Sequence, residues 1–403
     1  MTWRRYIYFW LAGVAGLCVL VALLNVVVDP YGLIGTREIR GLNVLKPAAT
    51  TRTRIVKPVQ GERAAPSTLI LGNSRPEMGL DPESAVWSSA QKPVYNAGIP
   101  GASVYRSMRY GQSILAEDSV QLVIWGLDFA DFLIRADQVR DRCSWPPPEE
   151  DWESRLRVSA SMLPADGWRM QRLKDYAVSI LSTGALVDSL TTITSQQDGG
   201  VGTRTALGFN PAQDYGPIIR AEGQHVLFAQ KNAEMDARLM DKDWEIVDEK
   251  CQSSEDYRSV EEFLGQAKDR GIPVILFINP YHVDYLETVW RAGLWPLFED
   301  WKRRLLRLAA DGGADALWDF SLLNDYTTEA PPPPGDRQAT LHWFWEPAHY
   351  KAELGELMLR EMLGSPAEGQ APVGVLLRSG TVDGHLDAQR RLAAARFGEV
   401  SPD

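Results

Sequence analysis

Apolar residues along the chain form one long run near the N-terminus and a series of short runs that alternate with helical patterns. The short runs with strand character are Thr68–Leu71, Val94–Asn96, Leu122–Trp125, Val274–Ile278 and Leu317–Phe320. Amphipathic patterns of helical spacing follow at Tyr105–Ala116, Val260–Lys268, Trp301–Ala309 and Tyr350–Leu363. Buried strands that alternate with helices predict an α/β fold on a parallel sheet.

The long run spans Tyr6–Val28, and Asn25 is the polar residue that interrupts it. At a helical rise of ~1.5 Å per residue, a helix of this length reaches about 34 Å and exceeds the ~30 Å hydrocarbon core of a bilayer. The alternative, a cleaved signal peptide, has a shorter apolar core and a small-x-small cleavage site. We therefore expect residues 1–30 to be an uncleaved transmembrane anchor.

Charges beside this run predict its orientation. Arg4 and Arg5 precede it and Asp29 follows it. Because positively charged flanks stay in the cytoplasm, the rest of the chain is expected on the other side of the membrane. This pattern fits a single-pass protein of the bacterial inner membrane whose C-terminal domain is periplasmic.

The soluble part divides by composition. Residues 31–65 are mixed and basic and are expected to form a linker, and 66–364 hold the predicted α/β domain. Between the third and fourth strands, residues 135–256 interrupt the alternation of strands and helices and carry helical patterns such as Met170–Leu181. We expect a mostly helical insertion there, either covering an active site or forming a peripheral cap. Residues 365–403 are expected to form a polar tail with one amphipathic segment near Leu386–Phe397.

Composition limits the classes of function. Asp and Glu outnumber Lys and Arg by 53 to 42, which gives a net charge of −11 and argues against a nucleic-acid-binding protein. Three cysteines are too few for a disulfide scaffold. Cys18 lies in the membrane run, whereas Cys143 and Cys251 lie in the exported insertion, where an oxidising compartment favours a disulfide between them.

The most informative chemistry follows the first predicted strand. The sequence Gly72-Asn-Ser74-Arg75 places a serine at the carboxyl end of a buried strand, where open α/β sheets present functional groups. A serine that opens a helix there can act as a nucleophile, with its own backbone N–H as an oxyanion donor. The alternative is a plain turn in which the serine is a helix N-cap.

Two further strand ends carry candidate groups. Asn96 ends the second strand, and Gly101 in the loop beyond it would let a backbone N–H approach a ligand closely. Asp128 follows the third strand just past a glycine. Taken singly, each is also consistent with an ordinary strand–helix turn or a surface cap.

The last candidate motif, Trp345-Glu346-Pro-Ala-His349, lies ahead of the final helical pattern. A carboxylate three residues before a histidine can fix the tautomer of the imidazole and stabilise its protonated form. His349 would then accept the proton of Ser74. The alternative is a histidine at a helix start with Glu346 compensating the helix dipole.

In this order the four motifs resemble the SGNH/GDSL hydrolase superfamily, a group of flavodoxin-like esterases and acyltransferases. The resemblance covers about 68–131 and 274–363. It implies a three-layer fold with Ser74 as nucleophile, His349 as base and Glu346 as the orienting acid. It also implies an oxyanion hole from the N–H groups of Ser74 and Gly101 together with a side chain at position 128.

The chain departs from the pattern of this superfamily at three positions. It has Asn73 where the superfamily has Asp, Glu346 where it has Asp, and Asp128 where it has an oxyanion-hole Asn. An ionised Asp cannot donate a hydrogen bond and would repel a developing oxyanion. Either Asp128 is protonated, or the two backbone N–H groups form the hole alone, or catalysis is absent or specialised.

Other residues at this sheet edge are weaker candidates. Arg75, Asn96 and His282 are possible substrate-binding residues, with a salt bridge or a structural role as the alternative for Arg75 and His282. The spacing of His342, Glu346 and His349 matches no common zinc signature, so we expect no metal site and no cofactor.

The leading hypothesis is an anchored, extracytoplasmic SGNH-like esterase or O-acyltransferase acting on an acyl ester of a cell-surface polysaccharide. An N-terminal anchor with an outward domain resembles envelope O-acetylation proteins, and this likeness adds a membrane acyltransferase as a possible partner. The alternative is a non-catalytic envelope protein that binds polysaccharide or assists assembly on the same fold.

Overall fold

A central six-stranded sheet organises the computed structural model, which describes residues 3–136, 145–147, 149–198, 201–247, 253–366 and 369–398. Its strand order is β10-β7-β6-β3-β1-β2. Five strands are parallel and β10 runs antiparallel to β7 at one edge. The strands are β1 (Thr68–Leu71), β2 (Val94–Asn96), β3 (Leu122–Leu127), β6 (Val274–Ile278), β7 (Ala316–Asp319) and β10 (Val375–Leu376). The predicted α/β class with a mainly parallel sheet is confirmed.

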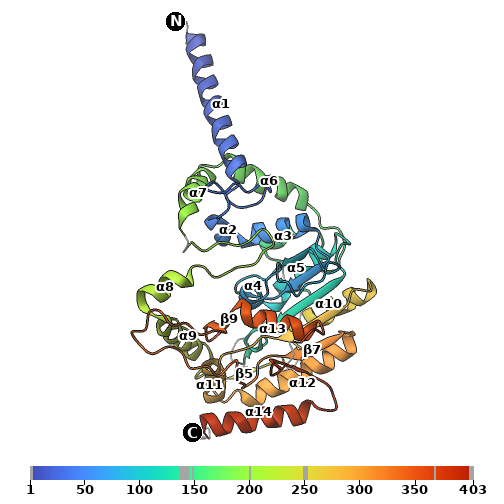
Figure 1. The fold of residues 1–403 in the computed structure, drawn as a ribbon. Helices are drawn as coiled ribbons and strands as arrows, with labels where there is room; N and C mark the ends of the chain where they lie inside the picture. The colour runs from blue at the N-terminus through green and yellow to red at the C-terminus, as the bar shows by residue number, and fades with distance from the viewer. Residues whose placement is uncertain are drawn as a thin grey trace.

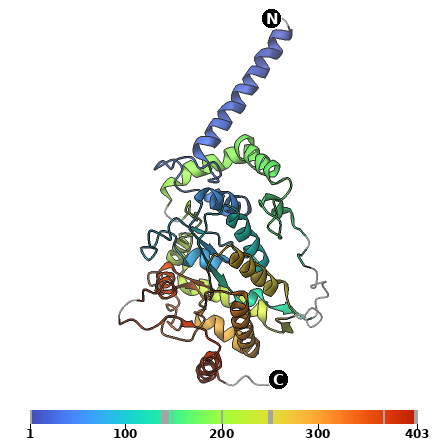
Figure 2. The same ribbon diagram turned by 90° about the vertical axis from the view of Figure 1, so that its right-hand side faces the viewer.

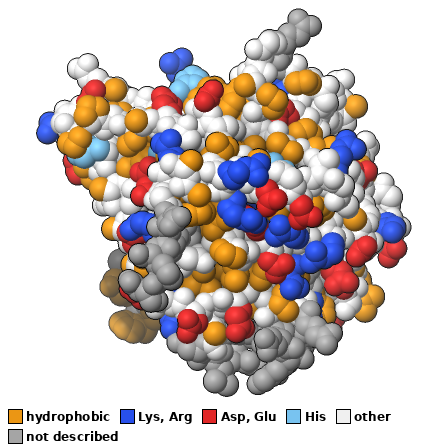
Figure 3. All heavy atoms as spheres, turned by 90° about the horizontal axis from the view of Figure 1, so that it is seen from below, with side chains coloured by type: hydrophobic (Ala, Val, Ile, Leu, Met, Phe, Trp, Pro, Cys, Tyr) orange, Lys and Arg blue, Asp and Glu red, His pale blue; other side chains and the backbone are white. Residues whose placement is uncertain are grey.

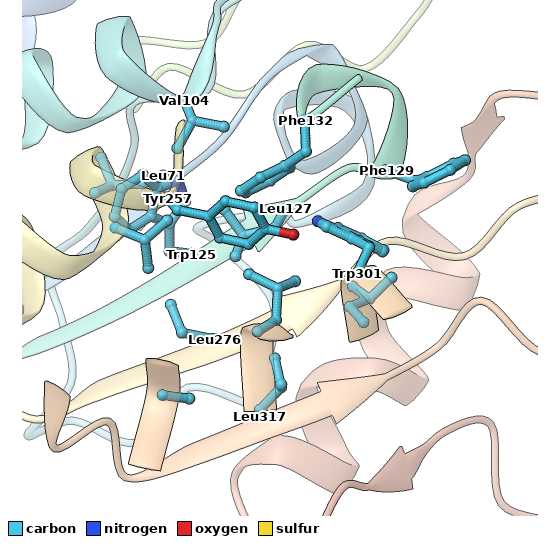
Figure 4. Packing of buried hydrophobic residues seen from close by; sticks show 14 of the residues in the cluster. Leu71, Val104, Trp125, Leu127, Phe129, Phe132, Tyr257, Leu276, Trp301 and Leu317 are labelled. Carbon is cyan, nitrogen blue, oxygen red and sulfur yellow. The ribbon is translucent and has the colours of Figure 1, made fainter. Parts of the chain in front are cut away.

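The sheet separates two hydrophobic cores, because alternate residues of a strand point to opposite faces. In β1, Leu69 and Leu71 join one core, whereas Ile70 joins the other. The first core includes Trp125, Tyr257 and Trp301 and is shown in Figure 4. Helices cover both cores, which gives three layers: α5 (Val104–Leu115), α10 (Glu255–Asp269) and α12 (Trp295–Gly312) on the first, and α4 (Ser74–Gly79) and α13 (Ala352–Met362) on the second.

The segment between β3 and β6 is mostly helical where it is described. Two short strands, β4 (Ile134–Arg135) and β5 (Trp244–Glu245), pair near its ends. Its helices are α6 (Trp168–Leu181), α7 (Thr183–Thr194), α8 (Tyr215–Glu222) and α9 (Gln224–Leu239). α6 and α7 lie at the base of α1, and α8 and α9 lie lower on the left side of the domain (Figure 1). The two cysteines expected to pair, Cys143 and Cys251, lie outside the described residues.

Helix α1 (Trp3–Val28) is long and apolar enough to cross a membrane and projects from the domain (Figures 1 and 2). The expectation of a linker over 31–65 is wrong, because α2 (Pro47–Thr51) and α3 (Thr53–Ala64) follow and pack on the domain. Lys57 of α3 is fully buried and donates to the carbonyls of Asn96 and Gly208 at 2.9 and 2.5 Å. The basic composition of this segment suggested a linker, but buried Lys57 binds the segment to the end of β2.

The C-terminal segment is also folded, in contrast to the polar tail expected there. β10 adds to the sheet edge, and α14 (Val382–Phe397) packs on α12 and on α11 (Val283–Arg291) through residues such as Leu386. α14 lies at the end of the molecule opposite α1 (Figure 1). A two-residue edge strand gives too short an apolar run to be recognised from sequence.

Candidate active site

A tight turn after β1 presents Ser74. Gly72 has φ +140°, and a Cβ there would lie 2.7 Å from Pro76 and 3.0 Å from the Gly126 carbonyl oxygen, so a side chain does not fit. The Asn73 side chain caps α4 by accepting the Arg75 N–H at 3.0 Å. Ser74 is therefore the first helical residue, and its N–H has no acceptor within the helix.

A small hairpin brings the histidine to this serine. β8 (Phe344–Glu346) pairs with β9 (His349–Tyr350), and Glu346 lies opposite His349. The His349 Nε2 atom is 2.7 Å from Ser74 Oγ. On the other side of the ring, Nδ1 hydrogen-bonds a carboxylate oxygen of Glu346. The structure thus brings together all three residues that the sequence proposed as a Ser-His-Glu arrangement.

Electrostatics fix the roles within this arrangement. Glu346 is 2% exposed, and burial alone would raise the pKa of its carboxyl. The charge and hydrogen bond of His349 outweigh burial and hold the pKa of Glu346 below its usual value. Glu346 is thus an ionised acceptor for Nδ1–H, which leaves Nε2 free to accept the Ser74 proton. The second oxygen of Glu346 accepts the Ala348 N–H at 2.7 Å and holds the turn.

The loop after β2 carries Gly101, the second oxyanion donor expected from the sequence. The loop after β2 is held to the Ser74 turn by a hydrogen bond from Ile99 N–H to the Gly72 carbonyl at 3.1 Å. Gly101 in this loop has φ +64° and is exposed, and in the described part of the chain its N–H donates to no other group. The N–H groups of Ser74 and Gly101, the two oxyanion donors expected from the sequence, are therefore both free of partners within the described residues.

Comparisons with known protein families, curated proteins and solved structures find no match to this chain. The chemistry of the site is therefore argued from its geometry.

Asp128 does not fit the oxyanion role considered from the sequence. It is fully buried, with Arg75 Nη1 at 2.9 Å from one carboxylate oxygen and the Tyr281 hydroxyl donating to the other at 2.8 Å. The Asn73 and Asn279 amides donate to the first oxygen as well. Both carboxylate oxygens accept from these four donors, so neither is free to face a substrate. We assign Asp128 to the support of the site.

Arg75 is part of the same support, which corrects its interpretation as a substrate-binding residue. Its guanidinium stacks over the rings of Tyr281 and Tyr285, at 5.2 and 5.4 Å from their centroids. Its Nε donates to the Ala348 carbonyl at 2.7 Å. Arg75 thus ties the Asp128 network to the turn that carries His349.

The other two substrate-binding candidates are also structural. Asn96 is fully buried and donates to the carbonyls of Pro76 and Leu80, both at 2.8 Å, so it holds the end of α4. His282 is fully buried, caps α11 and has its Nε2 2.8 Å from the Glu329 carbonyl. Neither side chain has a polar atom left over for a ligand.

Two residues of the insertion support the hairpin of Glu346 and His349, and no local sequence pattern identifies them. Gln224 of α9 is fully buried and donates to the carbonyls of Phe344 and Trp345 at 2.8 and 2.9 Å. Its side-chain oxygen accepts the Leu341 N–H at 2.7 Å. Tyr215 of α8 stacks on Trp345, with ring centroids 5.5 Å apart. The insertion therefore contacts the hairpin that carries Glu346 and His349.

Proposed function

We propose that this protein is a membrane-anchored, SGNH-like esterase or O-acyltransferase in which Ser74 is the nucleophile. The observation that carries the proposal is the contact of Ser74 Oγ with His349 Nε2 at 2.7 Å, with buried Glu346 on the opposite ring nitrogen. A serine is activated in this way when a base is in hydrogen-bond reach and is itself oriented by a third group.

The reaction proceeds in two balanced steps. Ser74 Oγ attacks the acyl carbonyl while His349 Nε2 takes the hydroxyl proton, and the N–H groups of Ser74 and Gly101 stabilise the oxyanion. The ester C–O bond breaks, and the leaving alcohol takes the proton from His349. In the second step His349 deprotonates water or a sugar hydroxyl, which attacks the acyl-serine. Collapse of this second intermediate returns the proton to Ser74.

The sheet order supports the SGNH-like part of the proposal. Read along the parallel strands, β2-β1-β3-β6-β7 is the order 2-1-3-4-5 of flavodoxin-like folds. The serine follows the first strand and the glycine follows the second, as in the resemblance. Glu346 and His349 follow the last parallel strand. Asn73 and Asp128, at which the chain departs from the superfamily pattern, contact each other. The superfamily has Asp at the first position and Asn at the second, so the carboxylate and the amide are exchanged between the two.

The proposed substrate class is an acyl ester of an envelope polysaccharide, with the catalytic domain on the periplasmic side. Helix α1 supports anchoring, and the Arg4–Arg5 pair before it supports the orientation. Beside Glu346, the stacked and partly exposed rings of Tyr215 and Trp345 offer the kind of aromatic surface on which sugar rings pack. A membrane acyltransferase that supplies acyl groups is the proposed partner, by analogy of architecture.

The test uses the full-length protein in detergent with an activated acetyl ester. Ester turnover and intact mass are followed for the wild type, Ser74→Ala and His349→Ala. His342→Ala, in the same loop but exposed, is the matched control. We expect turnover or an acetyl adduct in the wild type and the control, and neither in the two site variants. Oligosaccharide acceptors then separate transfer from hydrolysis.

An equal rate in wild type and Ser74→Ala, with no adduct on Ser74, would refute the nucleophile. In that case the non-catalytic alternative is tested by measuring whether polysaccharide binds equally well to Ser74→Ala and wild type.

A further inference from the structure

Helices α6 and α7 are fixed at the point where α1 enters the domain. Asn25 of α1 is fully buried, donates to the Ile180 carbonyl of α6 at 2.9 Å and accepts the Ser189 hydroxyl of α7 at 2.8 Å. In both views the pair lies across the base of α1 (Figures 1 and 2). If α1 crosses a bilayer, these two helices lie at the level of its surface.

These two helices have the reverse of the polarity expected in water. α6 buries Asp175 and Ser179, and α7 buries Ser189 and Thr192 beside the small Ala185. Six apolar side chains on the outside, which we call the apolar collar, are each at least half exposed: Met170, Leu173, Val178, Leu181, Val187 and Leu190. A helix at a protein–water surface turns such residues inward. The collar therefore requires an apolar neighbour.

We propose that the apolar collar is embedded in the headgroup–acyl boundary of the membrane that α1 crosses. The collar continues the exposed apolar surface of α1, so the same bilayer reaches both. Together α6 and the α7 segment are long and apolar enough for a span, but they bend by 61° at their junction. Bent and tied to Asn25, they lie along the surface, as interfacial helices do.

Charge near the collar fits an anionic lipid surface. Arg169 and Lys174 are exposed on α6. The loop with exposed Arg37 and Arg40 is held to the end of α1, since Thr36 Oγ1 donates to the Val26 carbonyl at 2.6 Å. By contrast, the face of the domain opposite α1 mixes charges of both signs (Figure 3). Apolar side chains flanked by Arg and Lys are typical of helices that bind membrane interfaces.

This contact rests on the membrane anchoring in the proposed function and deepens it. Because 31–65 is folded, no flexible tether separates α1 from the catalytic domain. Two attachments, α1 and the collar, would hold the domain at a fixed height and tilt. Ser74 would then act on acyl esters that come within a fixed distance of the bilayer.

The experiment labels single positions in the full chain reconstituted in vesicles of phosphatidylethanolamine and phosphatidylglycerol. Leu173→Cys and Val187→Cys are each made in a chain with Cys18→Ser, Cys143→Ser and Cys251→Ser and labelled with the fluorophore NBD. Leu392→Cys on α14, similarly exposed but at the opposite end, is the matched control. Val14→Cys reports the interior of α1. Nitroxide lipids quench the dye near the headgroups or deep in the bilayer.

We expect blue-shifted emission and shallow quenching at positions 173 and 187, deep quenching at 14 and neither at 392. Quenching at 14 alone would place the collar in water and overturn the proposal while leaving the anchor intact. Blue-shifted but unquenched emission at 173 and 187 would mean that protein, such as a second copy or a membrane partner, covers the collar, and would also overturn it. No quenching at 14 would overturn the anchor and the collar together.

A second measurement avoids the cysteine replacements. Leu173→p-benzoylphenylalanine in the otherwise unchanged chain is irradiated in the same vesicles, and adduct mass distinguishes lipid from protein cross-links. Lipid adducts support the proposal, and their absence with protein cross-links refutes it. Ester turnover depends on Ser74 and is measured on the same samples, so failure of the catalytic proposal and failure of the collar are read separately.

Discussion

Two buried carboxylates lie near Ser74 and differ in what they contact. Glu346 is 2% exposed and hydrogen-bonds His349, whose other ring nitrogen is 2.7 Å from the Ser74 hydroxyl oxygen. Asp128 is fully buried and contacts Arg75, which keeps its charge. In the proposed mechanism the first pair takes part in proton transfer, whereas the second pair holds its surroundings in place.

The difference shows that burial of an acid does not by itself identify a catalytic acid. Position on the sheet does not identify it either, since both carboxylates lie near the carboxyl ends of parallel strands. What distinguishes the two carboxylates is the group that each one contacts, His349 for Glu346 and Arg75 for Asp128. The Ala348 carbonyl, bound by Arg75, joins the two regions, so the inert network supports the reactive one.

The largest expected effect lies on the Glu346 side. Glu346→Gln keeps the shape of the side chain but offers an amide to Nδ1, which favours the wrong tautomer of His349. We expect turnover to fall by about 10⁴, as for loss of the acid in other triads, with little change in melting temperature. Turnover and thermal unfolding of the detergent-solubilised protein measure this. Exposed Glu353→Gln is the control, and wild-type turnover in Glu346→Gln would contradict the orienting role.

On the Asp128 side the expected effect is on stability. Asp128→Asn leaves the Arg75 guanidinium buried without its carboxylate, and breaking a buried ion pair in this way costs about 3–5 kcal/mol of unfolding free energy. Urea unfolding measures the loss, and turnover per folded molecule should fall far less than in Glu346→Gln.

Adding Asn73→Asp to that variant restores a carboxylate–amide contact with the groups exchanged, so we expect partial recovery of stability. A double-mutant cycle with no coupling between positions 73 and 128 would refute the idea that the two residues are an exchanged pair.

The five parallel strands and the positions of Ser74 and His349 at the sheet edge were predictable because their signals are local. A strand buried on both faces is a continuous apolar run, and Ser74 directly follows one. Other features depend on distant parts of the chain. Whether Asp128 supports or reacts is decided by Arg75 and Tyr281, and Lys57 is buried only because carbonyls of two other segments converge on it. No spacing rule links these residues.

A third test, of intermediate expected effect, concerns Gln224. This residue hydrogen-bonds neither carboxylate but donates to the hairpin that carries Glu346 and His349. Gln224→Leu removes three hydrogen bonds to that hairpin and the segment before it. A small displacement of a catalytic group lowers the rate by up to about 10²-fold, so we expect kcat to fall about 10–100-fold with KM unchanged. Exposed Gln213→Leu in the same insertion is the control. An effect on stability alone, with normal kcat, would limit Gln224 to folding.

The smallest expected effect is the pH dependence of stability on the Asp128 side. Burial, and next the charge of Asp128, raises the pKa of Asp131 to about 7, compared with about 3.9 in an unfolded chain. Between these values the folded protein binds more protons than the unfolded chain, so stability falls through this group as pH rises toward 7 and levels off above it. Asp131 keeps some contact with solvent, which screens the effect.

Asp131→Asn removes this titration, and its Oδ1 can still accept from the Asn73 amide. As pH rises from about 5 to about 8, Asp131 loses its proton and wild type loses the stability linked to it. The melting temperature of the variant should therefore rise relative to that of wild type over this interval. Exposed Asp325→Asn should show the same difference from wild type at both pH values. Glu346 behaves oppositely, because its lowered pKa means that stability is lost only as pH falls through that value. A pH-independent effect of Asp131→Asn would show that the two carboxylates at 128 and 131 do not share one charge environment.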